Sequence, residues 1–447
     1  MKKALFLLFA IMMSLGAKAQ YQLDTVLYAG DSKIFTDIVF LGDGFRESEM
    51  DKFVAFVKRQ TRLFFQKDPW KQYSNRFNVF YVKTPSNQSG AGETPQTPID
   101  NFYGVCFGTD GVDRMPWPTK WSKVFAVLKN VKPDYDMVPI IVNSMNYGGG
   151  GSAPFICYSM HETSIETLRH EAGHAFGSLS DEYWYQGTEA ANMTKKINPV
   201  KWERWMGDEG IGTYRYSTNP KDEGYSWYRP HEDCLMRYLY RDYCAVCREA
   251  LIERIHECSE NIVSFEPTNK NLKKAEGDMV FSVGLLKPNP NTLRVEWLLD
   301  DETVARDQDC YTLGMETEEG VHRLKVIVED TTLLVRTPNH TKLHASSVTW
   351  RVTVSQPVGI EAVSISSDEF KVGPLPFASE LVFCRKEPKD RPIRMELLNM
   401  AGGVEAEASF ADDSHCNLAT ESLTPGVYVL RVFSEGSLLY TRKVLKR

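Results

Sequence analysis

The chain has 447 residues, of which 42% are hydrophobic and 25% are charged, and its formal net charge is −7. This length and balance are typical of a folded protein of roughly two to three domains, and they exclude a disordered chain. The negative charge disfavours a nucleic-acid partner, because proteins that bind phosphate backbones carry an excess of Lys and Arg.

Residues 1–19 have the pattern of a secretory signal peptide. Two lysines precede an apolar run over residues 4–16, and the small-residue pattern Ala17-Lys18-Ala19 follows it. We therefore expect cleavage after Ala19, a mature chain that begins at Gln20, and a secreted or cell-surface protein. The apolar run is shorter than the roughly 20 residues that span a bilayer. No later stretch approaches that length, so we predict no transmembrane segment.

Residues 20–265 combine strand and helix patterns. Buried strands are predicted at 36–41, 76–82 and 137–142, and an amphipathic helix is predicted at 47–65. This order of elements predicts an α/β (α+β) domain. Every motif with catalytic chemistry lies within it.

Two further segments, residues 266–356 and 357–447, change to short strands of alternating polarity with turn residues between them. The clearest strands lie at 293–299, 322–328, 348–354, 394–399 and 427–432. Each segment is predicted to form an all-β sandwich, and the first is expected to be immunoglobulin-like. Neither contains His and carboxylate residues at catalytic spacing.

A second helix of the first domain is predicted from about Ser164 to Phe176. Thr163 and Glu166 have the spacing of a capping box, and an apolar pattern of helical period follows. Gly177 is expected to end this helix, because glycine can adopt the left-handed conformation there.

This helix carries His170, Glu171 and His174 in the pattern His-Glu-x-x-His. Both imidazoles lie on one face and can share a zinc ion, which raises the acidity of a water molecule and polarises a peptide carbonyl. Glu171 can take a proton from the water and pass it to the leaving nitrogen. Histidines on a helix can also be ordinary surface or core residues. Only 9 of the 447 residues are His, so chance would produce this motif in about one of a hundred such sequences.

A third ligand is expected in the turn after Gly177. Ser180, Asp181 and Glu182 can all return to the metal there. The carboxylates of Asp181 and Glu182 are competent zinc ligands, whereas a serine hydroxyl is a poor one.

The stretch His170 to Tyr183, HEAGHAFGSLSDEY, resembles the M64 family of metallopeptidases, which is named for an immunoglobulin A-cleaving member. The likeness covers about residues 25–265 and includes LGDGF at 41–45, FNVF at 77–80, NSMNYGGGG at 143–151 and CLMR at 234–237. It implies a zinc endopeptidase with a zincin-like or metzincin-like catalytic domain and one catalytic Zn²⁺.

The resemblance also implies roles for the residues of the motif. His170 and His174 would bind the ion, and Glu171 would be the general base. Metzincins usually have a third histidine ten residues after the first, and that position is Ser180 here. Asp181, the next residue, is therefore the expected third ligand.

Two residues are expected to support the ion without binding it. Met236 is similar to the methionine turn beneath the zinc of metzincins, and a plain core methionine is the alternative. Glu182 is expected to point away from the ion and to orient a ligand or a loop.

Four residues are candidates for substrate contacts. Gly148 and Gly149 follow a predicted strand and can form a cleft rim that binds an extended peptide, although a flexible surface loop is the alternative. Tyr183 and Tyr228 can donate a hydrogen bond to the transition state. No spacing rule selects between them, or excludes Tyr225 and His231.

The chain has nine cysteines. Cys234, Cys244, Cys247 and Cys258 cluster in sequence near the expected methionine turn. Together they can form a structural zinc site, but an exported protein favours disulfides.

The C-terminal segment resembles the sorting domains of the type IX secretion system of Bacteroidota. The residues that carry this likeness are 374–377, 398–402, 423–428 and 443–446. It implies secretion machinery as a partner. The alternative is a plain β-sandwich adaptor.

We therefore expect a secreted zinc-dependent metalloendopeptidase that acts on protein or peptide substrates, with host immunoglobulin or mucosal glycoproteins as candidates. One alternative is a host-glycan or matrix-binding protein with a degenerate peptidase domain. Another is a zinc amidase that acts on a non-protein substrate. The complete His-Glu-x-x-His motif argues against the degenerate domain.

Overall fold

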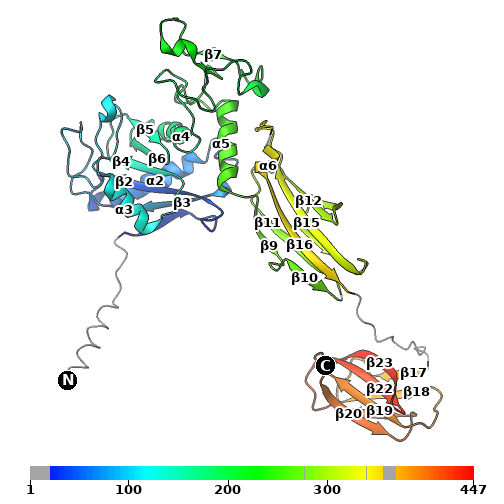
Figure 1. Ribbon diagram of the computed structural model, residues 1–447. Helices are drawn as coiled ribbons and strands as arrows, with labels where there is room; N and C mark the ends of the chain where they lie inside the picture. The colour runs from blue at the N-terminus through cyan, green and yellow to red at the C-terminus, as the bar shows by residue number, and fades with distance from the viewer. Residues whose placement is uncertain (1–20, 276, 339, 356–368) are drawn as a thin grey trace, which may run out of the picture. The chain divides into compact units, whose positions relative to one another are not determined.

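The computed structural model describes residues 21–275, 277–338, 340–355 and 369–447. The predicted signal peptide and the predicted boundary at residues 356 and 357 lie outside these ranges. The chain divides into two compact units between Val354 and Ser355 (Figure 1). The predicted mixture of helices with β-rich parts is confirmed.

The first unit begins with a six-stranded sheet of order β1-β3-β2-β4-β6-β5. Its strands are β1 (Leu23–Leu27), β2 (Thr36–Asp43), β3 (Phe77–Val82), β4 (Val138–Val142), β5 (Gly149–Ser152) and β6 (Phe155–Ser159). The four central strands are parallel, and the two edge strands, β1 and β5, are antiparallel to their neighbours. Every residue of the central strands is buried, as expected for a sheet that is covered on both faces.

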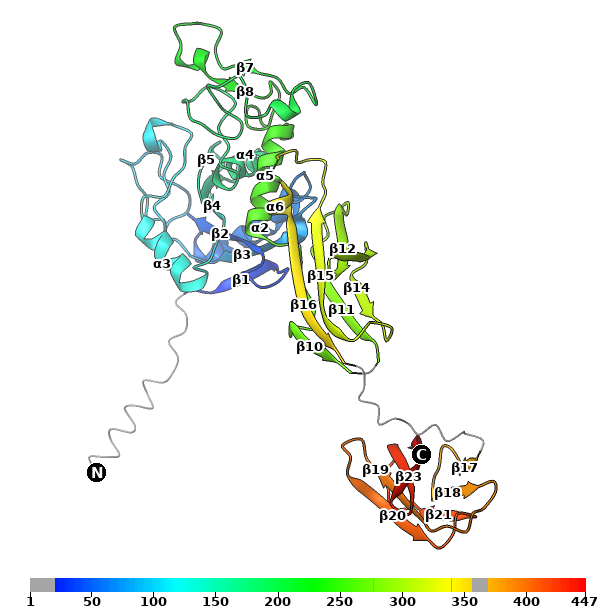
Figure 2. The ribbon, with the colours of Figure 1, turned by 45° about the vertical axis from the view of Figure 1, so that its right-hand side comes forward.

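Helices cover both faces of this sheet (Figure 2). Because side chains alternate along a strand, Val39 and Leu41 of β2 pack with helix α3 (Trp121–Val131) on one face. Ile38 and Phe40 contribute to the core on the other face. That core also contains helices α2 (Met50–Phe64), α4 (Ser164–Ala175) and α5 (Ala245–Cys258). Helix α4 contacts β5 and β6, so the helix with the histidine motif lies beside an edge strand.

Short elements complete this part of the chain. They are the 3-10 helices Glu47–Glu49, Ser74–Arg76, Thr109–Gly111, Glu203–Trp205 and Glu223–Ser226, and the paired strands β7 (Tyr214–Arg215) and β8 (Tyr228–Arg229). The predicted helix 47–65 is thus a 3-10 turn followed by α2, and the predicted strand 76–82 begins one residue later as β3.

Two sheets of the first unit enclose a second core. Their orders are β10-β16-β15-β12-β13 and β14-β11-β9. The elements are β9 (Ile262–Glu266), β10 (Asn271–Lys274), β11 (Met279–Leu285), β12 (Leu293–Leu299), β13 (Glu302–Arg306), β14 (Cys310–Leu313), β15 (Gly320–Asp330), α6 (His340–His344) and β16 (Ala345–Val354). Phe281, Trp297 and Trp350 are fully buried between the sheets.

A buried carboxylate joins this β-part to the α/β part. Asp330, at the end of β15, is fully buried. It accepts hydrogen bonds from the Tyr73 hydroxyl at 2.8 Å and from His256 Nε2 of α5 at 3.0 Å. The two parts therefore share a polar contact inside one compact unit.

The second unit consists of two antiparallel sheets, β17-β18-β21 and β20-β19-β22-β23. Its strands are β17 (Phe370–Gly373), β18 (Glu380–Arg385), β19 (Ile393–Leu398), β20 (Val404–Phe410), β21 (Cys416–Ala419), β22 (Gly426–Ser434) and β23 (Ser437–Lys446). Phe377, Phe383 and Leu430 are among the fully buried residues of its core.

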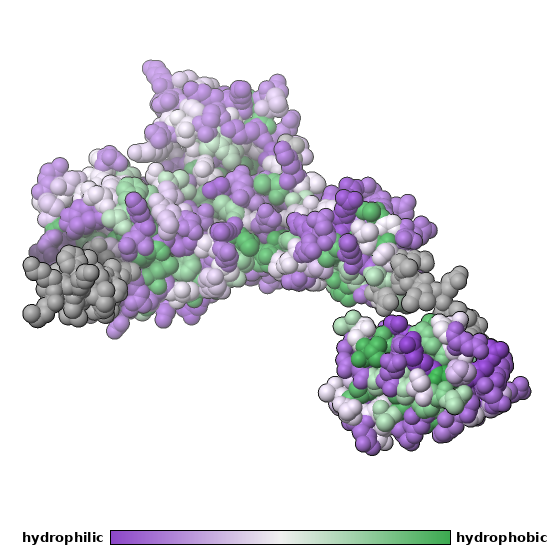
Figure 3. All heavy atoms as spheres, turned by 60° about the horizontal axis from the view of Figure 1, so that its bottom comes forward, coloured by the Kyte–Doolittle hydropathy of each residue, from purple (hydrophilic) through white to green (hydrophobic). Residues whose placement is uncertain are grey.

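One face of the molecule is drawn with its residues coloured by hydropathy in Figure 3. Hydrophilic residues predominate on the face shown in Figure 3, with smaller hydrophobic areas between them. Within the described ranges, no helix has the length and apolar character needed to cross a bilayer.

Candidate metal centre and active site

Helix α4 begins at Ser164, as predicted, but its first turn differs from a capping box. The Thr163 side chain makes no capping hydrogen bond. Glu166 instead forms an ion pair with Arg169 at 2.8 Å. The helix is therefore stabilised by its packing between α2 and strands β5 and β6 rather than by the predicted cap.

The end of α4 also corrects a prediction. The residue with a left-handed backbone is Ser178, with φ of 50°, and not Gly177. Gly177 is needed for another reason, because a Cβ atom there would lie 2.6 Å from Leu251 Cδ2 of α5. Close packing of α4 against α5 thus accounts for this glycine.

Three side chains converge after this turn. The Nε2 atoms of His170 and His174 lie 3.3 Å apart, and Asp181 Oδ1 lies 3.1 Å from the first and 3.2 Å from the second. Three donors about 2.0–2.2 Å from one tetrahedral ion would be separated by about 3.3–3.5 Å. The geometry and the chemistry of this donor set therefore fit a zinc ion.

The other nitrogen of each imidazole is held by the backbone. His170 Nδ1 lies 2.9 Å from the Leu235 carbonyl oxygen, and His174 Nδ1 lies 2.7 Å from the Leu179 carbonyl oxygen. Because carbonyl oxygens only accept, each Nδ1 carries a proton, and Nε2 is the atom that can bind a metal once it has lost its own proton.

Asp181 is positioned through the backbone on both sides. The Tyr216 hydroxyl donates to the Asp181 carbonyl oxygen at 2.7 Å. Asn192 holds the preceding residue, since its Oδ1 accepts from the Ser180 amide at 2.8 Å and its Nδ2 donates to the Ser180 carbonyl at 2.7 Å. Ser180 is thus fixed by an amide side chain, while Asp181 reaches the two histidines.

Met236 lies directly beneath the motif. A Cβ atom on Gly173 would be 2.5 Å from Met236 Sδ, so the methionine packs against the helix at this glycine. Met236 is fully buried. The predicted methionine-turn residue thus lies against the helix that carries His170 and His174.

Glu171 faces a cleft of about 400 Å³. Residues that line this cleft include Gly149–Gly151 of β5, His174, Asp181 and Tyr183. A Cβ on Gly151 would lie 2.8 Å from the Glu171 carbonyl oxygen and 3.0 Å from its Oε2. The glycines of the edge strand therefore let it approach the helix closely.

Charges in the cleft shift the titration of its groups. Burial raises the pKa of Glu171. Burial would lower the pKa of His174, but hydrogen bonding and charge attraction from Asp181 outweigh it and raise the pKa to about 9. Burial likewise opposes ionisation of Asp181, yet the two histidines hold its pKa well below the usual range. The carboxylate is thus ionised beside the imidazoles.

Of the other residues predicted to contact substrate, some line the cleft and others do not. The Tyr183 ring is parallel to that of His170 within 10°, with centroids 6.2 Å apart, and lines the cleft. Tyr228 lies in β8, where its backbone pairs with Thr194, and is not among the residues that line the cleft. Gly148 is buried against the Arg114 carbonyl, because a Cβ there would be 2.2 Å from that oxygen.

Sequence reasoning missed three residues near this centre. Arg114 lines the cleft, and its Nη2 donates to the Tyr183 hydroxyl at 3.4 Å. Tyr216 and Asn192 hold the loop of Asp181. No motif or spacing in the sequence relates these positions to the helix.

Two other groups of side chains among the described residues could hold a metal ion. One contains Glu182, Cys234, Cys244 and Cys247, and the other contains His256, Asp330 and His344. The expected disulfides are wrong, since all nine cysteines are free. Cys258 does not join its three neighbours in sequence.

Residues 25–207 match the family model described as IgA Peptidase M64. The match supports a peptidase and the predicted resemblance over this part of the chain. It ends before the cysteine-rich loop and helix α5. No curated protein matches the chain.

Solved structures show only weak likeness. Fibronectin(III)-like modules of Clostridium thermocellum CbhA are 18% identical, with 21% of this chain and 96% of that chain covered and a TM-score of 0.16. A Bacteroides ovatus SGBP-B in complex with a mixed-linkage heptasaccharide is 13% identical, with coverages of 40% and 42% and a TM-score of 0.15. A Parabacteroides merdae β-glucuronidase is 10% identical, with coverages of 53% and 29% and a TM-score of 0.15. TM-scores this low carry no argument about function.

Proposed function

We propose that this chain is a secreted zinc-dependent metalloendopeptidase with a zincin-like catalytic domain. The observation that carries the proposal is the convergence of His170, His174 and Asp181 next to a cleft that Glu171, His174 and Asp181 line. The family match over residues 25–207 supports the same class of enzyme.

His170, His174 and Asp181 would hold one zinc ion. Two neutral imidazoles and one carboxylate form a donor set that zinc accepts, and three protein ligands leave room for water or substrate. When bound, zinc supplies Lewis acidity toward a water molecule and toward the substrate carbonyl. The backbone carbonyls of Leu235 and Leu179 keep each ring in the tautomer that binds the ion.

Glu171 would move the proton. Its carboxylate accepts a proton from the attacking water and delivers it to the nitrogen of the broken peptide bond, so that the residue ends each cycle unchanged. Burial raises the pKa of Glu171, which makes the protonated form accessible for the delivery step.

The edge strand would orient the substrate. β5 pairs with β6 on one side, and its glycines Gly149–Gly151 line the cleft. An extended peptide can add to such a strand by backbone hydrogen bonds. Tyr183 and Arg114 also line the cleft, and their donor groups are candidates to stabilise the negative oxygen of the transition state.

A cleavage panel tests this function. The chain from residue 20 onward is incubated with immunoglobulin A, other immunoglobulins, mucins, unrelated proteins and peptidoglycan, and products are identified by mass spectrometry. We expect new internal peptide ends that disappear with a chelator and return with zinc. Release of only non-peptide products would favour the amidase, and binding of glycans without cleavage would favour the degenerate domain.

We further propose that export uses the N-terminal signal and the C-terminal β-unit. The support is the cleavage pattern at Ala19 and the likeness of residues 374–446 to sorting domains. N-terminal sequencing of extracellular protein should begin at Gln20. Deletion of the second unit should retain the protein in the cell, whereas unchanged export would leave that unit as an adaptor.

A further inference from the structure

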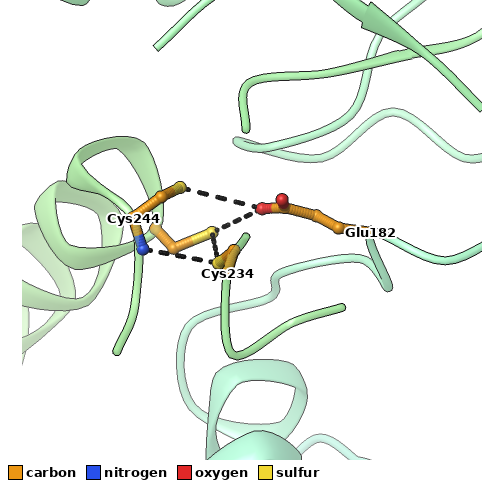
Figure 4. A group of neighbouring side chains, drawn as sticks. Glu182, Cys234 and Cys244 are labelled. Atoms are coloured by element: carbon orange, nitrogen blue, oxygen red, sulfur yellow. Dashed lines mark hydrogen bonds between the residues drawn. The ribbon is translucent and has the colours of Figure 1, made fainter. Parts of the chain in front are cut away.

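A second cluster of side chains that could hold a metal ion lies next in the chain to the proposed catalytic centre. It contains Glu182 and three cysteines, Cys234, Cys244 and Cys247. Glu182, Cys234 and Cys247 are fully buried, and Cys244 is 7% exposed. Cys244 is the N-cap of α5 and Cys247 lies in its first turn, while Cys234 comes from the loop before Met236. Figure 4 shows the labelled side chains of Glu182, Cys234 and Cys244 pointing toward one another.

The distances between the donor atoms fit a tetrahedral ion rather than a disulfide. The Sγ atoms of Cys234 and Cys247 are 3.8 Å apart. Glu182 Oε1 lies 3.1 Å from Cys247 Sγ and 3.8 Å from Cys244 Sγ. A disulfide requires sulfurs about 2.05 Å apart. Zinc with bonds of about 2.3 Å to sulfur and 2.0–2.2 Å to oxygen would separate these donors by about 3.5–3.8 Å. Two of the three distances lie in this range, and the Cys247–Glu182 pair, now a hydrogen bond, would open by a few tenths of an ångström.

The carboxylate of Glu182 is incompletely satisfied within the protein. Its Oε1 accepts from Asn192 Nδ2 at 3.2 Å and from the Cys247 thiol. Its Oε2 is buried and has no hydrogen-bond partner among the described residues. A buried carboxylate without full pairing is costly, and a cation at the cluster would remove that cost.

Burial opposes ionisation of the Cys234 thiol, but hydrogen bonds from the start of α5 outweigh it and lower the pKa of this thiol. The Cys244 backbone amide donates to Cys234 Sγ at 3.4 Å. Burial raises the pKa of the Cys244 and Cys247 thiols, and their place at the positive end of the α5 dipole offsets only part of that cost. Thiolate sulfur and carboxylate oxygen in a tetrahedral arrangement are a donor set that selects zinc.

We propose that Glu182, Cys234, Cys244 and Cys247 bind a second, structural zinc ion. The thiols bind as thiolates, so each releases its proton to solvent when the ion enters. All four positions around the ion are filled by the protein, which leaves none for water or substrate. This ion therefore stabilises the fold and takes no direct part in peptide hydrolysis.

Three contacts connect this second site to the first. Glu182 directly follows Asp181 in the chain. The Glu182 amide donates to the Met236 carbonyl at 2.7 Å. The Leu235 carbonyl, next to Cys234, accepts from His170 Nδ1. An ion held by Glu182 and Cys234 would thus fix both the loop of Asp181 and the loop of Met236.

Metal analysis of the protein from residue 20 onward tests the proposal. We expect two zinc ions per chain in the wild type and one in Cys247→Ser. The matched control is Cys258→Ser on the same helix, which should keep two. His174→Ala should lose the catalytic ion and keep the sulfur-bound one, so failure of the second site can be told apart from failure of the first.

X-ray absorption at the zinc edge of the wild type keeps the test independent of variant folding. The proposed catalytic ligands contain no sulfur, so zinc–sulfur scattering at about 2.3 Å reports the second site alone. Absence of that scattering together with one zinc per chain would overturn the proposal. A disulfide between any two of the three cysteines, found by mass spectrometry without reduction, would overturn it as well.

Discussion

Adjacent carboxylates, Asp181 and Glu182, belong to two groups of very different accessibility. The side chains of His174 and Asp181 are 17% and 16% exposed and reach a cleft. Glu182 and Cys247 are fully buried. An open position is what a catalytic metal requires, and a closed shell is typical of a structural one. Accessibility, and not only the type of ligand, therefore distinguishes what the two groups can do.

The largest expected effect separates chemistry from metal binding at the open site. Glu171→Gln should lower turnover by about 10²–10⁴-fold, because it removes the group that moves the proton. Zinc content should stay as in the wild type, since Glu171 is not among the converging ligands. Glu162→Gln, at an exposed position just before the same helix, is the control. Undiminished proteolysis by Glu171→Gln would contradict the proposed mechanism.

Separate substitutions of Asp181 and Glu182 should have different effects on the binding of the catalytic zinc. Asp181→Ala should lose the catalytic zinc under mild chelation, because a ligand to that ion is removed. Glu182→Ala should keep the catalytic zinc with affinity reduced by about 10–100-fold, the usual effect of removing a supporting contact. Titration with a competing chelator measures both. If Glu182→Ala lost the catalytic ion and Asp181→Ala kept it, the assignment of the third ligand would pass to Glu182.

The third group, His256, Asp330 and His344, should respond to pH and not to chelators. Asp330 already accepts hydrogen bonds from Tyr73 and His256, so it needs no ion. Burial lowers the pKa of His256 from 6.5 to about 4. Hydrogen bonds to Asp330, chiefly from His256, outweigh its burial and lower its pKa from 3.8 to about 2.

Because both pKa values are depressed in the folded protein, the fold should lose stability as the pH falls. The neutral His256 stabilises the fold fully above pH 6.5, and this contribution is lost as the pH falls from 6.5 toward 4. The loss is at most about 3.5 kcal/mol, from about 1.4 kcal/mol per pKa unit. Protonation of Asp330 adds a further loss below pH 3.8. Denaturant unfolding at several pH values should show a flatter dependence for His256→Gln than for the control His340→Gln. An equal pH dependence of stability in the two variants would show that His256 does not cause the loss of stability at low pH.

The smallest expected effect concerns the wall of the open cleft. Gly151→Ala places a methyl group 2.8 Å from the Glu171 carbonyl, and overpacking of this kind costs about 1–3 kcal/mol. We expect a lower melting temperature and slower turnover, with both metal ions retained. Ser152→Ala, at the exposed next residue of β5, should behave as the wild type. A Gly151→Ala enzyme with normal stability and rate would show that β5 can move away from α4.

The predictable part of this molecule is the part encoded by local pattern. The buried strands and helix α4 follow from runs of apolar residues and from helical period, and the His-Glu-x-x-His spacing alone places two imidazoles on one face. The choice of Asp181 over Glu182 needed the family resemblance, because both carboxylates are chemically competent and their orientation depends on the backbone after Ser178. Residue type suggested disulfides for the cysteines, whereas the fold brings Glu182 to them from 62 and 65 positions away. Arg114, Tyr216 and Asn192 carry no signal that links them to the helix.

The contact of Met236 with Gly173 limits how many sequences can satisfy this site. A motif written His-Glu-x-x-His leaves two positions free. In this chain one of them, Ala172, is fully buried, and a methyl group on the other would force a fully buried methionine to move. Neither position therefore accepts an arbitrary side chain. All five residues from His170 to His174 are constrained, and not only the three that the motif specifies. Chance agreement with the full arrangement is correspondingly rarer than the short motif alone would suggest.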